Sequence, residues 1–458
     1  MNTPWKAFSN YLKDNAKDPS RERYLETNHQ TPHGPIVAGA LGVLVFVVYY
    51  KIAYAYCTTA GLVDMKTHAE FAQNFYLKPE EFFKTWLKVP HMLWHLVVKA
   101  FESRVGLPLW DAASFTFALF GLFAFGVMTW FLFSMLRSHT GQKRLAFAAL
   151  GGMALSFVGP LIMAWFSDGY LGSFTPNPLH NPTHIASKGF GMLAMMAGID
   201  VIRGYRKESP VFFRKHPYLC FSLFALLSVL AKPTFLYMLL PAGILLILID
   251  LISAFTGLYR PTASTKENGT KKAQIKGQLE RRQRLIAVWG AAWRLALASL
   301  PACAYILTEY IALFFWGTEQ GTSVVVTKPL EVWHFYTWDV PTSILLGMLF
   351  PIWMLLTNLG YFYKSAEGRL SVLGYAFGVL EFSILAESGS RKDAGNFSWC
   401  MMAGMTIFYA VAVYRLMLST LQERTGKAHS AYLVISWFLL FLHVYSGLSL
   451  YEVFAGIL

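Results

Sequence analysis

Long apolar runs constrain this sequence more than any other feature. Residues 36–56 include one lysine and no acidic residue, and residues 233–254 include Asp250 as their only charged residue. About 20 consecutive apolar residues cross the hydrocarbon core of a bilayer as a helix, which satisfies its own backbone hydrogen bonds in lipid. The chain is 55% hydrophobic and 14% charged, whereas soluble domains carry about 25% charged residues. The sequence therefore predicts an all-α polytopic membrane protein.

Apolar runs separated by charged breaks predict about 11 transmembrane helices. The predicted spans are 36–56, 112–136, 145–167, 187–202, 217–231, 233–254, 291–316, 341–362, 370–386, 398–416 and 431–455. With the N-terminus in the cytoplasm, 26 of the 39 Lys and Arg residues fall in cytoplasmic segments, as the positive-inside rule requires. We therefore attribute the net charge of +13 to membrane topology and expect no nucleic-acid partner.

The predicted organisation is a short polar segment followed by one transmembrane domain. Residues 1–35 are polar and charged, which predicts a cytoplasmic N-terminal segment without a cleavable signal peptide. Residues 36–458 form the transmembrane domain, in which residues 255–290 are a basic cytoplasmic insert, partly disordered and then helical. The four cysteines are widely spaced, which predicts neither a disulfide framework nor a zinc site. These features favour the plasma (inner) membrane of a bacterium.

Residues 57–111 form the longest predicted non-cytoplasmic loop. Asp64 lies a few residues beyond the first span, and His68 follows four residues later, so both are expected on one helical face. Apolar residues then repeat at helical spacing at Leu93, Leu96, Val97 and Phe101. This pattern predicts an amphipathic helix lying in the membrane interface, with a second such helix over residues 79–88.

The stretch GSFTPNPLHNPTHIASKGF, residues 172–190, places three prolines and several polar residues between two apolar runs. Irregular backbone at membrane depth is tolerated where it is buried in protein or lines a cavity. We expect His180, Asn181 and His184 to direct donors and acceptors at a polyhydroxyl ligand. The alternatives are an ordinary proline-rich connector, or a metal site made by the two histidines.

Several of these features together resemble the GT-C superfamily of membrane glycosyltransferases. An acidic residue follows the first span, and a loop with interfacial helices then leads to the second span. The stretches GSFTPNPLHNPTHIASKGF, LLSVLAKPTFLYMLLPA and AESGSRKDAGNFSW are similar to segments of poorly characterised bacterial polysaccharide-locus members. The resemblance implies a GT-C-like fold and transfer from a polyprenyl-phosphate-linked sugar, with the active site on the non-cytoplasmic face. Many relatives carry paired acids in the first loop, whereas the acid nearest to Asp64 is Glu70.

The resemblance implies that Asp64 is the catalytic residue of the first loop. As a general base it would deprotonate the acceptor hydroxyl that attacks the anomeric carbon, and a single displacement would invert the configuration. His68 would orient the substrate or Asp64. Because Asp64 has no adjacent acid, a divalent metal is not favoured, and we expect no cofactor.

A phosphate-linked donor also requires cations near the membrane surface. Lys232, Lys188 and Arg391 lie at outer ends of predicted spans or in outer loops, against the positive-inside pattern. Arg391 can bind a phosphate in a bidentate manner, and Lys232 can act as a point charge. The alternative for each is an ion-paired or snorkelling residue.

Two acids and an aromatic residue complete the candidate site. Glu309 lies inside a predicted span and Glu387 at the outer end of another, and acids at membrane depth are functional candidates by default. Trp333 belongs to an aromatic-rich outer loop over residues 317–340. It can stack on a sugar acceptor or belong to an interfacial aromatic belt.

The leading hypothesis is an integral membrane glycosyltransferase that moves a sugar from a polyprenyl-phosphate donor to a glycan or lipid-linked acceptor. The first alternative is a polysaccharide polymerase or ligase that uses a diphosphate-linked glycan, although the largest outer loop comes early in this chain. The second is a lipid-glycan transporter or flippase, which would be expected to show internal repeats. The third is a non-catalytic scaffold subunit.

Overall fold

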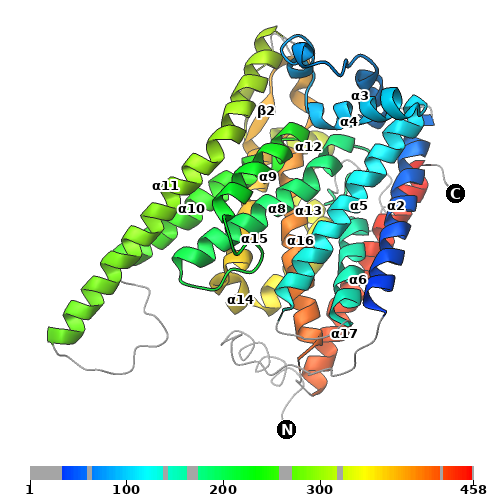
Figure 1. The fold of residues 1–458 in the computed structure, drawn as a ribbon. Helices are drawn as coiled ribbons and strands as arrows, with labels where there is room; N and C mark the ends of the chain where they lie inside the picture. The colour runs from blue at the N-terminus through cyan, green and yellow to red at the C-terminus, as the bar shows by residue number, and fades with distance from the viewer. Residues whose placement is uncertain are drawn as a thin grey trace.

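The fold is a bundle of helices with several short elements across one end (Figure 1). The computed structural model describes residues 33–58, 64–137, 143–161, 174–256, 271–316, 323–422 and 426–455. The long helices are α2 (Gly34–Thr58), α5 (Leu109–Met135), α6 (Lys143–Phe157), α8 (Pro182–Tyr205), α9 (Pro217–Ala231), α10 (Thr234–Thr256), α11 (Lys271–Trp316), α13 (Val340–Thr357), α15 (Ala366–Ile384), α16 (Ser398–Thr420) and α17 (Lys427–Ala455).

The prediction of an all-α multi-pass membrane protein is confirmed. Within the described part of the chain, eight helices are long and apolar enough to cross a membrane, namely α2, α5, α8, α10, α11, α13, α16 and α17. Shorter apolar helices occupy residues 144–157 and 217–231, and the predicted span over residues 370–386 coincides with α15. The prediction of 11 spans therefore rests on eight helices of sufficient length and three shorter or more polar ones.

Helix α11 leans along one flank of the bundle (Figure 1). At 1.5 Å per residue, its 46 residues extend over about 69 Å, roughly twice the thickness of a hydrocarbon core. Its first turns belong to the basic insert predicted over residues 255–290, so the helical part of that prediction is confirmed. Residues 257–270 of the insert lie outside the described residues.

The short elements at one end of the bundle include α3 (Asp64–Gln73), α4 (Met92–Ala100) and α12 (Glu331–Tyr336). We call this the α3–α4 end. Helix α4 buries Met92, Trp94 and His95 against the protein, whereas Leu93 and Leu96 remain half-buried, as expected of an amphipathic helix. The second helix predicted over residues 79–88 is two short 3₁₀ turns instead, η2 (Pro79–Glu81) and η3 (Trp86–Lys88).

A two-stranded antiparallel sheet at the α3–α4 end joins the predicted outer loop 317–340 to the end of the predicted span 370–386. Strands β1 (Val324–Val326) and β2 (Leu385–Glu387) pair with Val324 opposite Glu387 and Val326 opposite Leu385. The prediction contained no strand, because runs of three residues carry no recognisable periodicity. The pairing fixes the position of Glu387 relative to the loop that follows α11.

Helices α8 and α16 form the centre of the bundle, and almost all of their residues are buried. Glycines allow α15 and α16 to approach closely, as is usual between helices in membranes. A Cβ atom at Gly378 would lie 2.6 Å from the Cα atom of Met401, and one at Gly404 would lie 2.7 Å from the Cα atom of Tyr375. The close contact between these backbones fixes where α16 begins.

The proline-rich segment before α8 is buried in protein, which agrees with the expectation for irregular backbone at membrane depth. Asn177 donates to the carbonyl oxygens of Leu155 and Val158 at 3.0 and 2.8 Å. It thereby satisfies carbonyl groups at the end of α6 that have no partner within the helix. Lys188 donates to the carbonyl oxygen of Pro176 at 3.2 Å and also contacts Asn177, which fixes the segment to α8.

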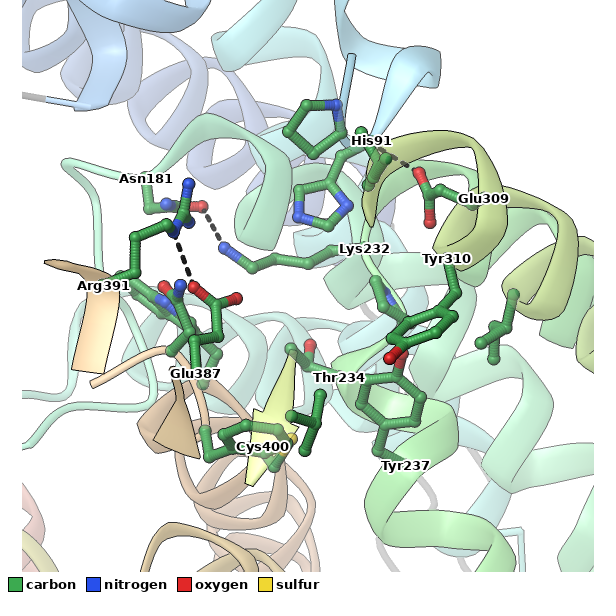
Figure 2. Close-up of a pocket in the computed structure, with 18 of the residues that line it drawn as sticks. His91, Asn181, Lys232, Thr234, Tyr237, Glu309, Tyr310, Glu387, Arg391 and Cys400 are labelled. Atoms are coloured by element: carbon green, nitrogen blue, oxygen red, sulfur yellow. Dashed lines mark hydrogen bonds and ion pairs between the residues drawn. The ribbon is translucent and has the colours of Figure 1, made fainter. Parts of the chain in front are cut away.

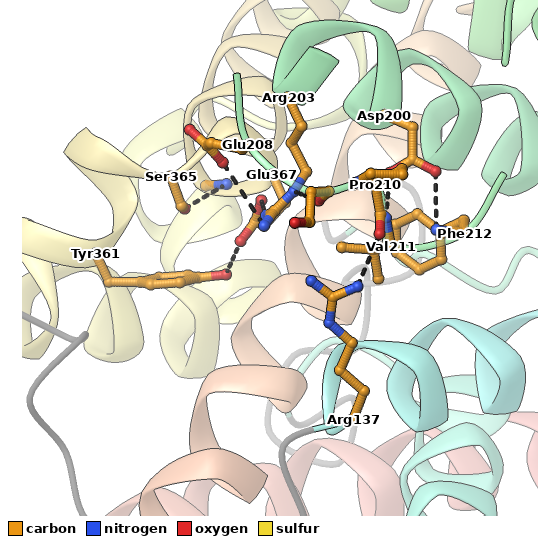
Figure 3. Close-up of polar contacts among 12 residues, drawn as sticks. Arg137, Asp200, Arg203, Glu208, Pro210, Val211, Phe212, Tyr361, Ser365 and Glu367 are labelled. Carbon is orange, nitrogen blue, oxygen red and sulfur yellow. Dashed lines mark hydrogen bonds and ion pairs between the residues drawn. The ribbon is translucent and has the colours of Figure 1, made fainter. Parts of the chain in front are cut away.

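A polar network fixes the opposite end of the bundle (Figure 3). The carboxylate of Asp200 accepts hydrogen bonds from the backbone N–H groups of Val211, Phe212 and Phe213 at 2.6, 2.8 and 2.5 Å. Arg203 lies 3.7 Å from the carboxylate of Glu367. These contacts fix the turn after α8 and connect α8 to the start of α15.

Candidate active site

A cavity of about 240 Å³ opens at the α3–α4 end of the bundle (Figure 2). It gathers seven of the residues predicted from the sequence: Asp64, His68, Asn181, Lys232, Glu309, Glu387 and Arg391. These residues come from five separate regions of the chain. Their convergence is a property of the fold, since no two of the regions are adjacent in sequence.

Asn181 links the predicted base to the predicted cation. Its side-chain oxygen accepts hydrogen bonds from Lys232 Nζ at 3.1 Å, from the backbone N–H of His184 at 2.9 Å and from Thr183 Oγ1 at 3.0 Å. Because all three partners are donors, the Nδ2 group must face the other way, where it donates to Asp64 Oδ2 at 2.7 Å. Asn181 is also the N-cap of α8, which explains why it stands immediately before Pro182.

Lys232 lies in the break between α9 and α10, with an extended backbone (φ −172°). The predicted break before Pro233 is therefore confirmed. The side chain is 5% exposed, and its ammonium group lies 4.2 Å from the centroid of the Trp399 ring, in a cation–π contact. Burial lowers the pKa of Lys232 to about 8, although the nearby carboxylate of Asp64 opposes this shift.

His68 lies one helical turn after Asp64 on α3, and both line the cavity as predicted. Its Nδ1 atom is 2.9 Å from Nε2 of His95, whose own Nδ1 atom is 3.1 Å from the carbonyl oxygen of His91. Burial, followed by the charge of Lys232, lowers the pKa of His68 to about 3. The ring is therefore neutral at physiological pH.

His91 is strained and was not predicted from the sequence. It caps α4 in the left-handed region with φ 66°, which is uncommon for a residue other than glycine. Its N–H group donates to Glu309 Oε1 at 3.0 Å, and its ring lines the cavity. Strained backbone that is held by surrounding contacts is often found at functional sites.

Helix α11 supplies the wall of the cavity that faces α10. Glu309 is 4% exposed and Tyr310 lies beside it, while Tyr237 of α10 completes this side. On the other side, Glu387 and Arg391 form an ion pair at 2.6 Å, with side chains 15% and 39% exposed. Figure 2 shows the Glu387–Arg391 pair on one side of Lys232, and Glu309 with Tyr310 on the other side.

Three long helices begin at the cavity. Asn181 caps α8, Pro233 and Thr234 begin α10, and Trp399 lies in the first turn of α16; all four line the cavity. The N-terminus of a helix carries a partial positive charge and free N–H groups, which favour anions. The backbone therefore adds positive potential to that of the side-chain cations.

Four predicted residues lie outside the cavity lining. The rings of His180 and His184 lie 5.6 and 5.7 Å from Trp399, so they support the cavity wall from behind. Burial lowers the pKa of His180 to about 4. Lys188 is 1% exposed and fixes the proline-rich segment to α8. It is therefore placed to stabilise the fold and not to contact a ligand in the cavity.

Trp333 is also outside the cavity, because α12 turns its ring into the protein. The ring is fully buried, and it packs against Phe174 at 5.7 Å and Phe382 at 4.8 Å between ring centroids. Trp333 therefore neither belongs to an interfacial aromatic belt nor offers an exposed ring face to a sugar, so both expectations were wrong. An aromatic residue in a predicted loop is equally compatible with a core position, and the sequence does not distinguish between them.

Sequence reasoning missed further lining residues, of which we consider six: His91, Thr234, Tyr237, Tyr310, Trp399 and Cys400. All but His91 lie within or at the start of a long apolar helix, where a side chain facing a cavity cannot be told from one facing the core. The signal available for His91 was Pro90, which precedes the start of α4.

Among the described residues, no three His, Cys, Asp or Glu side chains form a group that could hold a metal ion. His180 and His184 are both in contact with Trp399.

No known protein family model matches the sequence, and no curated protein matches it either.

Proposed function

We propose that the protein is an integral membrane glycosyltransferase that moves a sugar from a polyprenyl-phosphate donor to a glycan or lipid-linked acceptor. The observation that carries this proposal is the connection Asp64–Asn181–Lys232 within one cavity. It places a carboxylate able to act as a base close to a buried cation able to bind phosphate. A resident metal ion is not part of the proposal.

The proposed reaction is a single displacement with inversion. Asp64 takes the proton of the acceptor hydroxyl as its oxygen forms a bond to the anomeric carbon of the donor sugar. The bond between the anomeric carbon and the phosphate oxygen breaks, and its electron pair leaves with the polyprenyl phosphate. Lys232 stabilises the negative charge that develops on this leaving group.

The cations and the helix N-termini support recognition of a phosphate. Lys232 is buried and carries a charge below pH 8, while the starts of α8, α10 and α16 add positive potential from the backbone. Arg391 is engaged by Glu387, so a phosphate would have to compete with this carboxylate. Lys232 is therefore the primary phosphate contact in this proposal, and Arg391 a secondary one.

The size and remaining lining of the cavity support a sugar as the transferred group. Pockets for drug-sized ligands occupy roughly 300–1,000 Å³, so a cavity of about 240 Å³ suits a sugar-phosphate head group and leaves the polyprenyl chain in lipid. Glu309, Tyr237 and Tyr310 offer hydrogen bonds and ring faces to a sugar. The distribution of Lys and Arg in the sequence supports placement of the cavity on the non-cytoplasmic side of the plasma membrane.

A transfer assay tests the proposal. Purified protein is incubated with a panel of radiolabelled polyprenyl-phosphate sugars and membrane acceptors, with and without EDTA. Wild-type protein is expected to transfer the sugar, and Asp64→Asn is expected to lose at least about 100-fold in rate, the usual contribution of a general base. Glu70→Gln is the matched control, because Glu70 is an exposed acid on the same helix outside the cavity.

Each outcome discriminates among the hypotheses. Loss of activity in Asp64→Asn together with full activity in Glu70→Gln supports the assignment of the base. Equal activity in both variants removes Asp64 from the mechanism. Transfer only from diphosphate-linked glycans would favour a polymerase or ligase, and no transfer from any donor would contradict a glycosyltransferase.

A further inference from the structure

A continuous chain of hydrogen bonds runs along one wall of the cavity. The carboxylate of Glu309 accepts the backbone N–H of His91 at 3.0 Å, and the carbonyl oxygen of His91 is 3.1 Å from Nδ1 of His95. The Nε2 atom of His95 is then 2.9 Å from Nδ1 of His68. The chain thus joins α11 to α3 through the first turn of α4.

The chain determines which ring nitrogens carry protons. A carbonyl oxygen can only accept a hydrogen bond, so Nδ1 of His95 must carry hydrogen. In a neutral ring, Nε2 of His95 then has a free lone pair and accepts from Nδ1–H of His68. Nδ1 of His68 therefore carries hydrogen, and Nε2 of the same ring does not. Among the described residues this Nε2 atom has no partner, and His68 lines the cavity.

The surroundings keep both rings neutral. His95 is fully buried and stacks on Phe75 with ring centroids 5.4 Å apart and planes at 12°. Burial lowers the pKa of His95 well below its ordinary value, and the neighbouring His68 adds to this effect. Burial and the charge of Lys232 likewise lower the pKa of His68. A proton shared between the two rings as an imidazolium is therefore disfavoured.

We infer that His68 binds a hydroxyl group of the acceptor sugar through its unprotonated Nε2 atom, and that His95 is a positioning residue that fixes this tautomer. The inference rests on the proposed function for the identity of the ligand. It assigns to the cavity a neutral hydrogen-bond acceptor one helical turn from Asp64. A hydroxyl that donates its one proton to His68 orients the sugar, while Asp64 removes the proton of a different hydroxyl, the one that attacks the anomeric carbon.

The tautomer is tested by nuclear magnetic resonance on full-length protein in lipid nanodiscs, labelled with ¹⁵N-histidine. Spectra of His68→Asn and His95→Gln assign the two rings by difference. Both rings are expected in the form protonated at Nδ1 and not at Nε2. A protonated Nε2 on His68 would overturn the inference.

Hydroxyl recognition is tested by adding the methyl α-glycosides of glucose, galactose, mannose and N-acetylglucosamine as probes. At least one is expected to move the Nε2 resonance of His68, and its permethylated form, which has no hydroxyl donor, is expected to leave it unchanged. No response to any of the four, or an equal response to the permethylated form, contradicts the inference.

Two substitutions separate positioning from packing. His95→Phe keeps a ring against Phe75 but removes both nitrogens, and it is expected to weaken binding of the responding glycoside by about threefold to tenfold, as for one neutral hydrogen bond. His95→Gln retains an amide oxygen that can accept from His68, and it is expected to restore binding. Equal binding in all three proteins would show that His95 only packs.

These readouts do not require catalysis, so the two proposals can fail separately. A glycoside that shifts the His68 resonance in a protein without transferase activity would support hydroxyl recognition and contradict the proposed function. Transfer activity together with the opposite tautomer would support the function and contradict the role of His68.

Discussion

The side-chain amide of Asn181 donates a hydrogen bond of 2.7 Å to the carboxylate of Asp64, across 117 positions of the sequence. The bond joins the first residue of α3 to the N-cap of α8. Since the same amide also accepts from Lys232, one side chain sets the geometry between the proposed base and the proposed phosphate contact. Its two functions, capping and connection, can be separated by substitution.

Asn181→Ser is expected to keep the cap of α8 but to lose the contact with Asp64. Serine caps helices about as well as asparagine, whereas Asn→Ala at an N-cap costs about 0.5–2 kcal/mol. We therefore expect Asn181→Ser to unfold near the wild-type temperature while transfer activity falls, and Asn181→Ala to lose both stability and activity. Thermal unfolding in detergent and the transfer assay measure these effects. Wild-type activity in Asn181→Ser would show that the bond to Asp64 is not required.

Binding of the donor is expected to weaken as the pH rises through about 8, the pKa to which burial lowers Lys232. Below this pH the ammonium group is charged and attracts phosphate; above it the charge is lost, while the phosphodiester remains anionic. The KM for the donor, measured between pH 6.5 and 9.5, should therefore increase above pH 8. Lys232→Arg keeps its charge at high pH and should remove this increase. An increase that persists in Lys232→Arg would point to another group.

Glu387→Gln is expected to remove the carboxylate that pairs with Arg391 and to strengthen binding of the donor. The ion pair is partly exposed, so its loss should cost less than about 1 kcal/mol of stability. A phosphate no longer competes with the carboxylate, and the KM for the donor should fall roughly twofold to fivefold. Lys392→Gln is the control, since Lys392 pairs with Glu331 outside the cavity. An unchanged KM in Glu387→Gln would exclude Arg391 from donor binding.

Gly378→Ala is expected to destabilise the protein and to displace the start of α16. The added Cβ atom would lie 2.6 Å from the Cα atom of Met401 and from the carbonyl oxygen of Cys400, and backbone atoms cannot rotate away. Overpacking of this kind costs about 1–3 kcal/mol. Gly243→Ala is the matched control, because a Cβ atom there meets nothing within 4 Å. Equal unfolding temperatures for the two variants would contradict close packing between α15 and α16.

Local chemistry in the sequence predicted much of the architecture. Apolar runs located the long helices, Pro233 located the break that holds Lys232, and the spacing of Asp64 and His68 placed both on one face of α3. Each of these inferences depends on neighbours within a few residues. They succeed because helix periodicity and proline geometry act over the same short range.

Long-range packing accounts for what the sequence did not reveal. Trp333 enters the core because α12 turns toward Phe174 and Phe382, and nothing in its own segment distinguishes core from interface. The left-handed conformation of His91 is held by Glu309, which lies 218 positions away. The β1–β2 pairing likewise depends on two segments that come together only in the folded protein.

The meeting of three helix starts at the cavity has a consequence for how its chemistry could vary among related proteins. The potential from these starts resides in peptide groups, so no side-chain substitution can remove it while the helices keep their positions. Cations such as Lys232 could be replaced or relocated during divergence, and the cavity would still attract negative charge. The attraction for anions therefore depends on the path of the backbone, and it can persist after every recognisable sequence motif has changed.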